Sequence, residues 1–249
     1  MKATAQVSRL SNLERALLVL PILGGVVFGA LPFLLGGGFG KLVGFPGNDT
    51  FIYRLAGAAT FGYAVSLILG LMQNEWEPLR LVVVATLTFN LASILACLMA
   101  IVSGDTNLLV YLIFGTSIAI SAITIWLLNS HKTSARPAPD LSVGETRMLW
   151  LGVVLSGAFG LLPLLVPVLL AQLVGYKGTD VFLIRQAGAA SLGYAIMAYY
   201  AIRSSVWHEV RLPVVMALTF NGLSFIASVL ALLANALRAI RWNGSHSKP

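Results

Sequence analysis

The chain has 249 residues, of which 58% are hydrophobic and only 10% are charged. Because soluble domains carry about a quarter charged residues, this composition excludes an ordinary soluble domain and predicts a membrane protein. The formal net charge of +7 does not indicate a nucleic-acid-binding protein, since the basic residues are scattered along the chain instead of forming one stripe. The lipid bilayer, with its anionic headgroups, is the expected partner.

Seven apolar stretches reach the length of about 20 residues that a helix needs to cross the hydrocarbon core of a bilayer. We therefore predict an all-α fold, a polytopic membrane protein with seven transmembrane helices. The predicted spans are residues 16–36, 51–72, 80–103, 108–128, 148–171, 181–202 and 211–235. All nine acidic residues fall between these spans or at their edges. The first span follows basic residues, as in a secretory signal, but lacks a convincing cleavage site, so we expect a retained helix.

The sequence repeats itself at an offset of 131 residues. The phrase "RLAGAATFGYA" begins at Arg54, and "RQAGAASLGYA" begins at Arg185. Without any gap, 35 of the 93 positions from Ser11 to Ser103 are identical to the positions 131 residues later. This extent indicates an internal duplication of three spans. The repeated small residues also predict that the second and sixth spans pack closely near Gly62 and Gly193.

The unmatched fourth span decides how the two copies are oriented. Three spans alone would leave the second copy inverted relative to the first, and a fourth span restores its orientation. We therefore predict a 3+1+3 arrangement of two parallel three-helix repeats, related by an approximate two-fold axis along the membrane normal. The predicted units are a first repeat (1–103), a linker helix (104–128), a polar linker (129–144) and a second repeat (145–249).

The basic residues favour a cytoplasmic N-terminus by a small margin. With this orientation, nine lysines and arginines lie on the cytoplasmic side and seven on the other, and cytoplasmic loops are usually the more basic. We expect a multi-pass protein of the cell membrane. Trp76 and Trp207, each followed one helical turn later by an arginine, are expected to anchor the helices at the headgroup level.

Arg54 and Arg185 stand in the first turn of the second and sixth spans, each five residues after an aspartate at the expected N-cap, Asp49 or Asp180. A cation at this position opposes the helix dipole, so a compensating anion is expected. The cap aspartate is one candidate, and a lipid phosphate or an acidic ligand is the other. Snorkelling to the interface would need neither. We treat both arginines as candidates for lipid or anion contact.

Asn90 and Asn221 occupy equivalent positions deep inside the third and seventh spans. Each lies ten residues from the start of its span, which places it about 15 Å deep, near the bilayer midplane. An unsatisfied amide is costly in hydrocarbon, so both should face protein or a wet cavity. Interhelical hydrogen bonding and a site for a neutral solute both explain them. The candidate solute-binding residues are Asn90, Asn221, Tyr63, Tyr194, Thr88 and Thr219.

The helix count, the linker helix and the pair of midplane asparagines resemble the SWEET sugar transporters. This resemblance implies parallel repeats and a substrate site to which Asn90 and Asn221 would contribute. The chain departs from that family in lacking its proline-glutamine type of signature. The likeness is one of topology, and topology does not fix function.

No catalytic constellation is visible in the sequence. No span carries clustered cysteine, histidine or acidic residues for a metal, a histidine for haem, or a lysine for a Schiff base. We therefore expect no enzymatic activity, no metal and no cofactor. Two classes of function stay open. One is a facilitator or binder of a small neutral solute between the repeats, and the other is a non-catalytic accessory subunit of a larger membrane complex. Other membrane subunits or a homo-oligomer are the protein partners considered.

Overall fold

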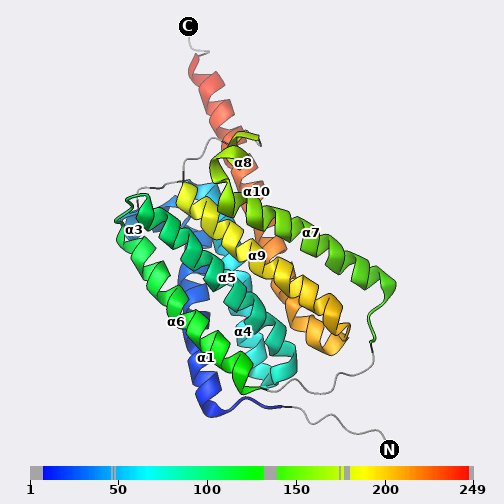
Figure 1. Cartoon of the computed structure of the whole chain (residues 1–249). Coiled ribbons are helices and arrows are strands. Elements are labelled where there is room, and N and C mark those ends of the chain that lie inside the picture. The colour runs from blue at the N-terminus through cyan, green and yellow to red at the C-terminus, as the bar shows by residue number, and fades with distance from the viewer. Residues whose placement is uncertain are drawn as a thin grey trace, which may run out of the picture.

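The structure is a computed structural model that describes residues 8–45, 47, 49–131, 139–173, 175–176 and 180–246, with side chains described up to 237. Residues 132–138 of the predicted polar linker, including Lys132 and Arg136, lie outside these residues. The described helices are α1 (Asn12–Gly25), η1 (Val26–Ala30), α2 (Leu31–Leu35), α3 (Gly37–Leu42), α4 (Thr50–Gln73), α5 (Trp76–Val102), α6 (Leu108–Ser130), α7 (Val143–Leu165), α8 (Pro167–Leu173), α9 (Val181–Ser204) and α10 (Trp207–His246) (Figure 1).

The all-α fold with seven apolar helices is confirmed. The described residues contain seven helices that are long and apolar enough to cross a membrane. The first of these combines α1, η1 and α2 as Asn12–Leu35, and the last is the part of α10 from Trp207 to Leu237. The chain therefore has the architecture of a multi-pass membrane protein.

Capping boxes begin the first and fifth spans. Ser11 Oγ accepts a hydrogen bond from Glu14 N, and the Glu14 carboxylate accepts one from Ser11 N at 2.7 Å. Ser142 and Glu145 repeat the same exchange at the start of α7. Because these bonds satisfy free N–H groups of the first turn, the helices start at Asn12 and Val143. These starts precede the predicted ones by four and five residues.

Prolines interrupt both first spans of the predicted repeats. A proline inside a helix lacks an N–H donor and crowds the preceding turn. Before Pro32 the chain forms the wide π-turn η1, in which Leu31 N donates to Val26 O. Before Pro167 the helix ends, and Val166 leaves the helical region at φ −131° and ψ 52°. The predicted fifth span, 148–171, is therefore two helices, α7 and α8.

The helices of the two halves interlock at the centre of the bundle. α5 packs along α9, and α10 packs along α4, so each third helix lies against the second helix of the other half. Of the apolar segment of α9, 72% of the residues are buried. The fold is therefore one bundle with α4 and α9 inside it.

Two tyrosines join α4 to α9 at mid-membrane. Tyr63 Oη donates to Ala190 O at 2.6 Å, and Tyr194 Oη donates to Ala59 O at 2.8 Å. The two rings lie edge to face, with centroids 5.1 Å apart. The two donors are 131 residues apart, and so are the two acceptors, so both bonds join equivalent positions of the repeated sequence. The description as two parallel repeats stays a prediction.

Glycines allow α4 and α9 to approach each other here. A Cβ atom at Gly62 would collide with the Tyr194 hydroxyl, and one at Gly193 would collide with the Tyr63 hydroxyl. The predicted contact between the second and sixth spans near these glycines is thus present. The backbone atoms nearest these glycines are Met216 O on α10 and Ala85 O on α5, so the same small residues also let α10 approach α4 and α5 approach α9.

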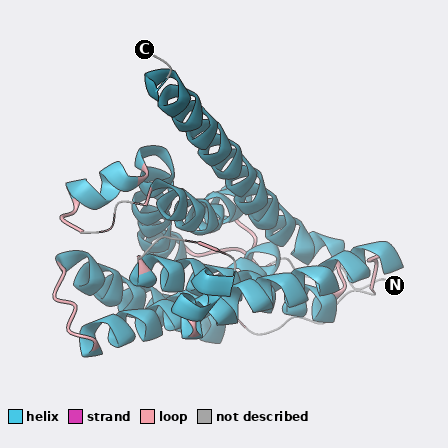
Figure 2. Ribbon diagram, turned by 90° about the horizontal axis from the view of Figure 1, so that it is seen from above, coloured by secondary structure: helices cyan, strands magenta, loops and turns pink. Residues whose placement is uncertain are grey.

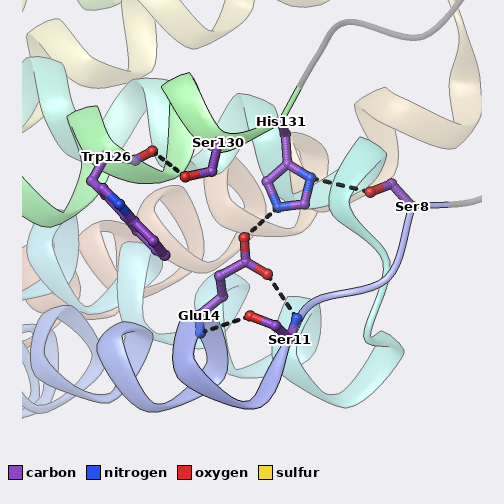
Figure 3. A network of polar contacts seen from close by, with 6 residues as sticks. All are labelled: Ser8, Ser11, Glu14, Trp126, Ser130 and His131. Carbon is purple, nitrogen blue, oxygen red and sulfur yellow. Dashed lines mark hydrogen bonds and ion pairs between the residues drawn. The ribbon is translucent and has the colours of Figure 1, made fainter.

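A partly buried polar network joins the residues before and at the start of α1 to the end of α6 (Figure 3). The Glu14 carboxylate lies 2.7 Å from His131 Nε2, and the other ring nitrogen of His131 lies 3.1 Å from Ser8 Oγ. The His131 ring also stacks on Trp76, with centroids 4.2 Å apart. Trp76 is only 3% exposed, so the prediction that it anchors at the headgroups was wrong. It packs inside the bundle because His131 covers it.

Candidate functional site

A cavity of about 80 Å³ opens among α1, η1, α4, α5 and α6, with one turn of α9 closing part of its wall. The cavity lies near mid-membrane, because Asn90 in its wall is the fifteenth of the 27 residues of α5. Most of the wall is apolar. The polar side chains in the wall are Tyr53, Thr60, Tyr63, Thr86, Asn90, Ser93, Thr116, Ser117 and Gln186. None of these is charged, so the cavity offers hydrogen bonds without a net charge.

A chain of hydrogen bonds crosses three helices at this wall. Ser117 Oγ on α6 donates to Ser93 Oγ on α5 at 3.2 Å, and Ser93 Oγ donates to Gln186 Oε1 on α9 at 2.8 Å. Gln186 Nε2 then donates to Cys97 Sγ at 3.5 Å. All four residues are buried. The network fixes the direction in which each polar group points, because a buried side chain without a partner would cost free energy.

Asn90 contributes an acceptor to the cavity. Its Nδ2 donates to Thr86 O at 2.8 Å, one turn earlier in the same helix. Within the described part of the chain, its Oδ1 accepts no hydrogen bond, although the residue is only 4% exposed. An amide oxygen in this state is suited to a water molecule or to a donor group of a small solute.

The structure brings only some of the candidate solute-binding residues together. Asn90 and Tyr63 line the cavity, and Tyr194 packs against Tyr63 outside its wall. Thr88 and Thr219 lie outside the wall and donate to carbonyls of their own helices, at 3.0 and 2.9 Å.

Asn221 differs from its counterpart Asn90. It lies on the exposed side of α10, where Nδ2 donates to Ala217 O at 2.8 Å. The difference arises because α6 covers α5, whereas no described helix covers α10 in the same way. The two asparagines therefore do not share one site.

Sequence reasoning missed Gln186, Ser93 and Ser117. Gln186 carried a usable signal, because it replaces Leu55 of the first copy in an otherwise apolar helix. Ser117 lies in the unmatched fourth span, where the repeat offers no comparison. Serine in a transmembrane helix is also common enough to pass unnoticed.

Arg54 and Arg185 are partly buried, and the Nε atom of each is buried without a hydrogen-bond partner. Asp49 caps α4, as its position predicts, by accepting from Phe51 N at 2.9 Å. Asp180 does not cap α9; its carboxylate accepts from Asp49 N at 3.3 Å instead. Among the described residues, neither aspartate forms an ion pair with its arginine, so the cap aspartate is not the compensating anion.

The two aspartates lie close together at the start of α4 and α9, with the Tyr176 hydroxyl donating to Asp49. Burial, together with the negative charge of Asp49, raises the pKa of Asp180 above its ordinary value of 3.8, although the hydrogen bond from Asp49 N opposes this shift. Protonation of Asp180 therefore favours the folded state.

This shift sets the pH dependence of stability at Asp180. Its contribution is fully present below pH 3.8 and is lost as the pH rises through the raised pKa. The Asp180→Asn variant keeps an oxygen for Asp49 N but has no charge. In detergent, we expect the melting temperature of the native chain to fall relative to that of this variant between about pH 3 and about pH 7. A difference that stays constant over this range would contradict the assignment.

No protein-family model matches the chain, and neither curated proteins nor solved structures give a match. The likeness to SWEET sugar transporters is thus limited to the sequence features given above.

Proposed function

We propose that this chain binds a small neutral polar solute in the cavity beside Asn90, as a facilitator or a binder, and that it is not an enzyme. The observation that carries the proposal is a mostly apolar cavity near mid-membrane whose polar groups are all uncharged. A buried cavity needs about 10–15 Å³ to hold one water molecule. At about 80 Å³ the cavity has room for several water molecules or one small solute.

The chemistry of the wall supports a neutral solute. Asn90 offers a free amide oxygen, and the hydroxyl groups beside it both donate and accept. An ion would lose its hydration in these apolar surroundings, and the wall has no opposite charge that would compensate for this loss. The residues of the proposed site come from the first half of the chain, from α6 and from the start of α9, which contributes Gln186. The sequence instead suggested a site between the two halves.

Two leucine variants test the proposal. A panel of neutral solutes such as urea, glycerol and small amides is added to the detergent-solubilised protein, and the rise in melting temperature measures binding. Asn90→Leu and Gln186→Leu are expected to weaken binding of the stabilising solute about 2- to 10-fold each, because each removes one hydrogen-bonding group. Leucine is a natural replacement at position 186, because the equivalent residue in the first copy is Leu55.

Thr88→Val is the matched control, because Thr88 lies on the same helix outside the cavity wall. It should leave solute binding unchanged. Stopped-flow swelling of liposomes then shows whether the bound solute also crosses the membrane. If no neutral solute stabilises the native chain, or if all three variants bind equally well, the cavity is not a solute site.

An accessory role in a membrane complex is the alternative that we keep. It is favoured by the outer helices, since only 17% of the residues in the apolar segment of α7 and 11% in that of α10 are buried. Purification from native membranes in mild detergent, with identification of co-migrating subunits, tests this alternative. Under both proposals the chain resides in the cell membrane with its N-terminus in the cytoplasm. Arg54 and Arg185 are proposed to contact lipid phosphates.

A further inference from the structure

A larger cavity lies at the end of the bundle where α4 and α9 begin. Its volume is about 1200 Å³, and it is lined by α3, the start of α4 and the last third of the apolar part of α10. We call it the α10 cavity. Figure 2 shows α10, which ends at the C-terminus, running out of the bundle. Pockets for drug-sized ligands have volumes of roughly 300–1,000 Å³, so the α10 cavity is far larger than a single inorganic ion requires.

The α10 cavity extends from the end of the membrane spans into the hydrocarbon region. On α4 it is lined by the first turns, from the cap Asp49 to Arg54. On α10 its lining residues lie between 227 and 235, which are the 21st and 29th of the 31 residues of the span Trp207–Leu237. This stretch covers about 12 Å of helix length. Leu232 in this wall is 69% exposed, so this side of the cavity is accessible from the bilayer.

Two cations line the α10 cavity without a partner. Within the described part of the chain, the side chains of Lys41 and Arg54 form no ion pair and no hydrogen bond. Asp49 lines the same cavity, but its carboxylate already accepts hydrogen bonds from the first turn of α4 and from the Tyr176 hydroxyl. The Asp180 carboxylate accepts one from Asp49 N. The aspartates are thus engaged with protein donors, whereas the two cations are available to an anion.

The wall that α10 contributes is mainly aliphatic. Its polar members are Ser228 and Asn235, and the others are Ala227, Leu230, Ala231, Leu232 and Ala234. A free phosphate ion would leave this wall in contact with water, which is unfavourable for aliphatic side chains. A cavity with cations at one end and an aliphatic helix along one side is instead complementary to an amphiphile that carries a phosphate.

We propose that an anionic phospholipid occupies the α10 cavity, with its phosphate beside Lys41 and Arg54 and one acyl chain along α10. Arginine and lysine are the side chains that most commonly bind phosphate oxygens. An ammonium headgroup would add a third cation to a cavity whose two carboxylates are already hydrogen-bonded, so an anionic headgroup is favoured. The proposal rests on the lipid contact proposed above for Arg54, and it is independent of the neutral solute.

Lipid binding by the purified full chain tests the proposal. Phosphatidylglycerol, phosphatidylcholine or inorganic phosphate is added to the chain in a mild neutral detergent. Native mass spectrometry counts the retained lipid molecules, and the rise in melting temperature measures stabilisation. One phosphatidylglycerol molecule is expected to be retained. Phosphatidylcholine should bind at least about 5-fold more weakly because it carries no net charge, and inorganic phosphate should not stabilise the chain.

Two charge variants test the headgroup contacts. Lys41→Gln and Arg54→Gln are each expected to weaken retention of phosphatidylglycerol about 5-fold, which is the usual contribution of one basic residue beside an anionic lipid. Lys41 is exposed, so its variant should fold like the native chain. Arg147→Gln is the matched control, because Arg147 is an exposed cation near the start of α7 that does not line the cavity. It should leave retention unchanged.

Ala231→Trp tests the position of the acyl chain while both cations stay in place. Ala231 lines the cavity, so an indole there should fill part of it and lower retention. Leu233→Trp is the control, because Leu233 is 56% exposed and points about 200° away around the helix. Solute binding beside Asn90 should be unchanged in all these variants, which separates a failure of this proposal from a failure of the proposed solute site.

Four results would overturn the lipid assignment. The first is that no phosphatidylglycerol is retained, or that phosphatidylcholine is retained equally well. The second is equal stabilisation by inorganic phosphate, which would indicate a site for a free anion. The third is an equal loss of retention in Arg147→Gln, which would indicate a general effect of charge. The fourth is full retention in Ala231→Trp.

Discussion

Replacing Gly57 with alanine is expected to lower the free energy of unfolding by about 1–3 kcal/mol. A Cβ atom at this position would lie 2.6 Å from Gly29 O and 2.6 Å from Phe33 N. Both atoms belong to the backbone of the interrupted first span, so neither can turn away as a side-chain end would. Relief requires that α4 move away from η1 and α2, and the surrounding side chains then lose their close packing.

The unfolding transition in mild detergent measures this effect, with an expected decrease of about 2–4 °C per kcal/mol for a chain of this size. Gly115→Ala is the matched control, because nothing lies within 4 Å of a Cβ added there. Alanine at that exposed helical position should be neutral or slightly stabilising. If both variants melt together, the close approach of α4 to the first span does not contribute to stability.

Replacing Glu14 with alanine is expected to destabilise the fold by about 1–3 kcal/mol. The carboxylate accepts from Ser11 N at 2.7 Å and bonds His131 Nε2 at 2.7 Å (Figure 3). Its loss removes half of the capping box and takes the carboxylate partner from the partly buried His131 ring. The ring also holds its stacking position on Trp76 through this bond. Several contacts between the chain start and α6 would therefore weaken together.

Glu145→Ala provides the comparison that separates the two contributions. Glu145 forms the same capping box with Ser142 but is exposed, and no described histidine lies against it. Its replacement should remove only the capping hydrogen bond from Ser142 N. The melting temperature should therefore fall clearly less than it does for Glu14→Ala. Equal losses would mean that the bond to His131 adds nothing to the stability of the fold.

The elements of the fold follow from local properties of the sequence, because crossing a bilayer is decided by length and apolarity within one segment. The seven spans were predictable for this reason, and the proline break before Pro167 could have been predicted by the same local reasoning. The contact near Gly62 and Gly193 was also predictable. Small residues repeated at helical spacing mark a face on which backbones can meet, whatever the partner helix is.

The candidate site depends on which helices become neighbours, and only the tertiary structure decides this. Asn90 and Asn221 stand in the same local sequence, yet α6 covers one and leaves the other exposed. Gln186 joins the cavity because α9 packs along α5 of the other half, where Ser93 meets it. Glu14 and His131, 117 residues apart, pair for the same reason. Burial and hydrogen bonding between distant segments are properties of packed surfaces, so a duplicated sequence can place identical residues in different environments.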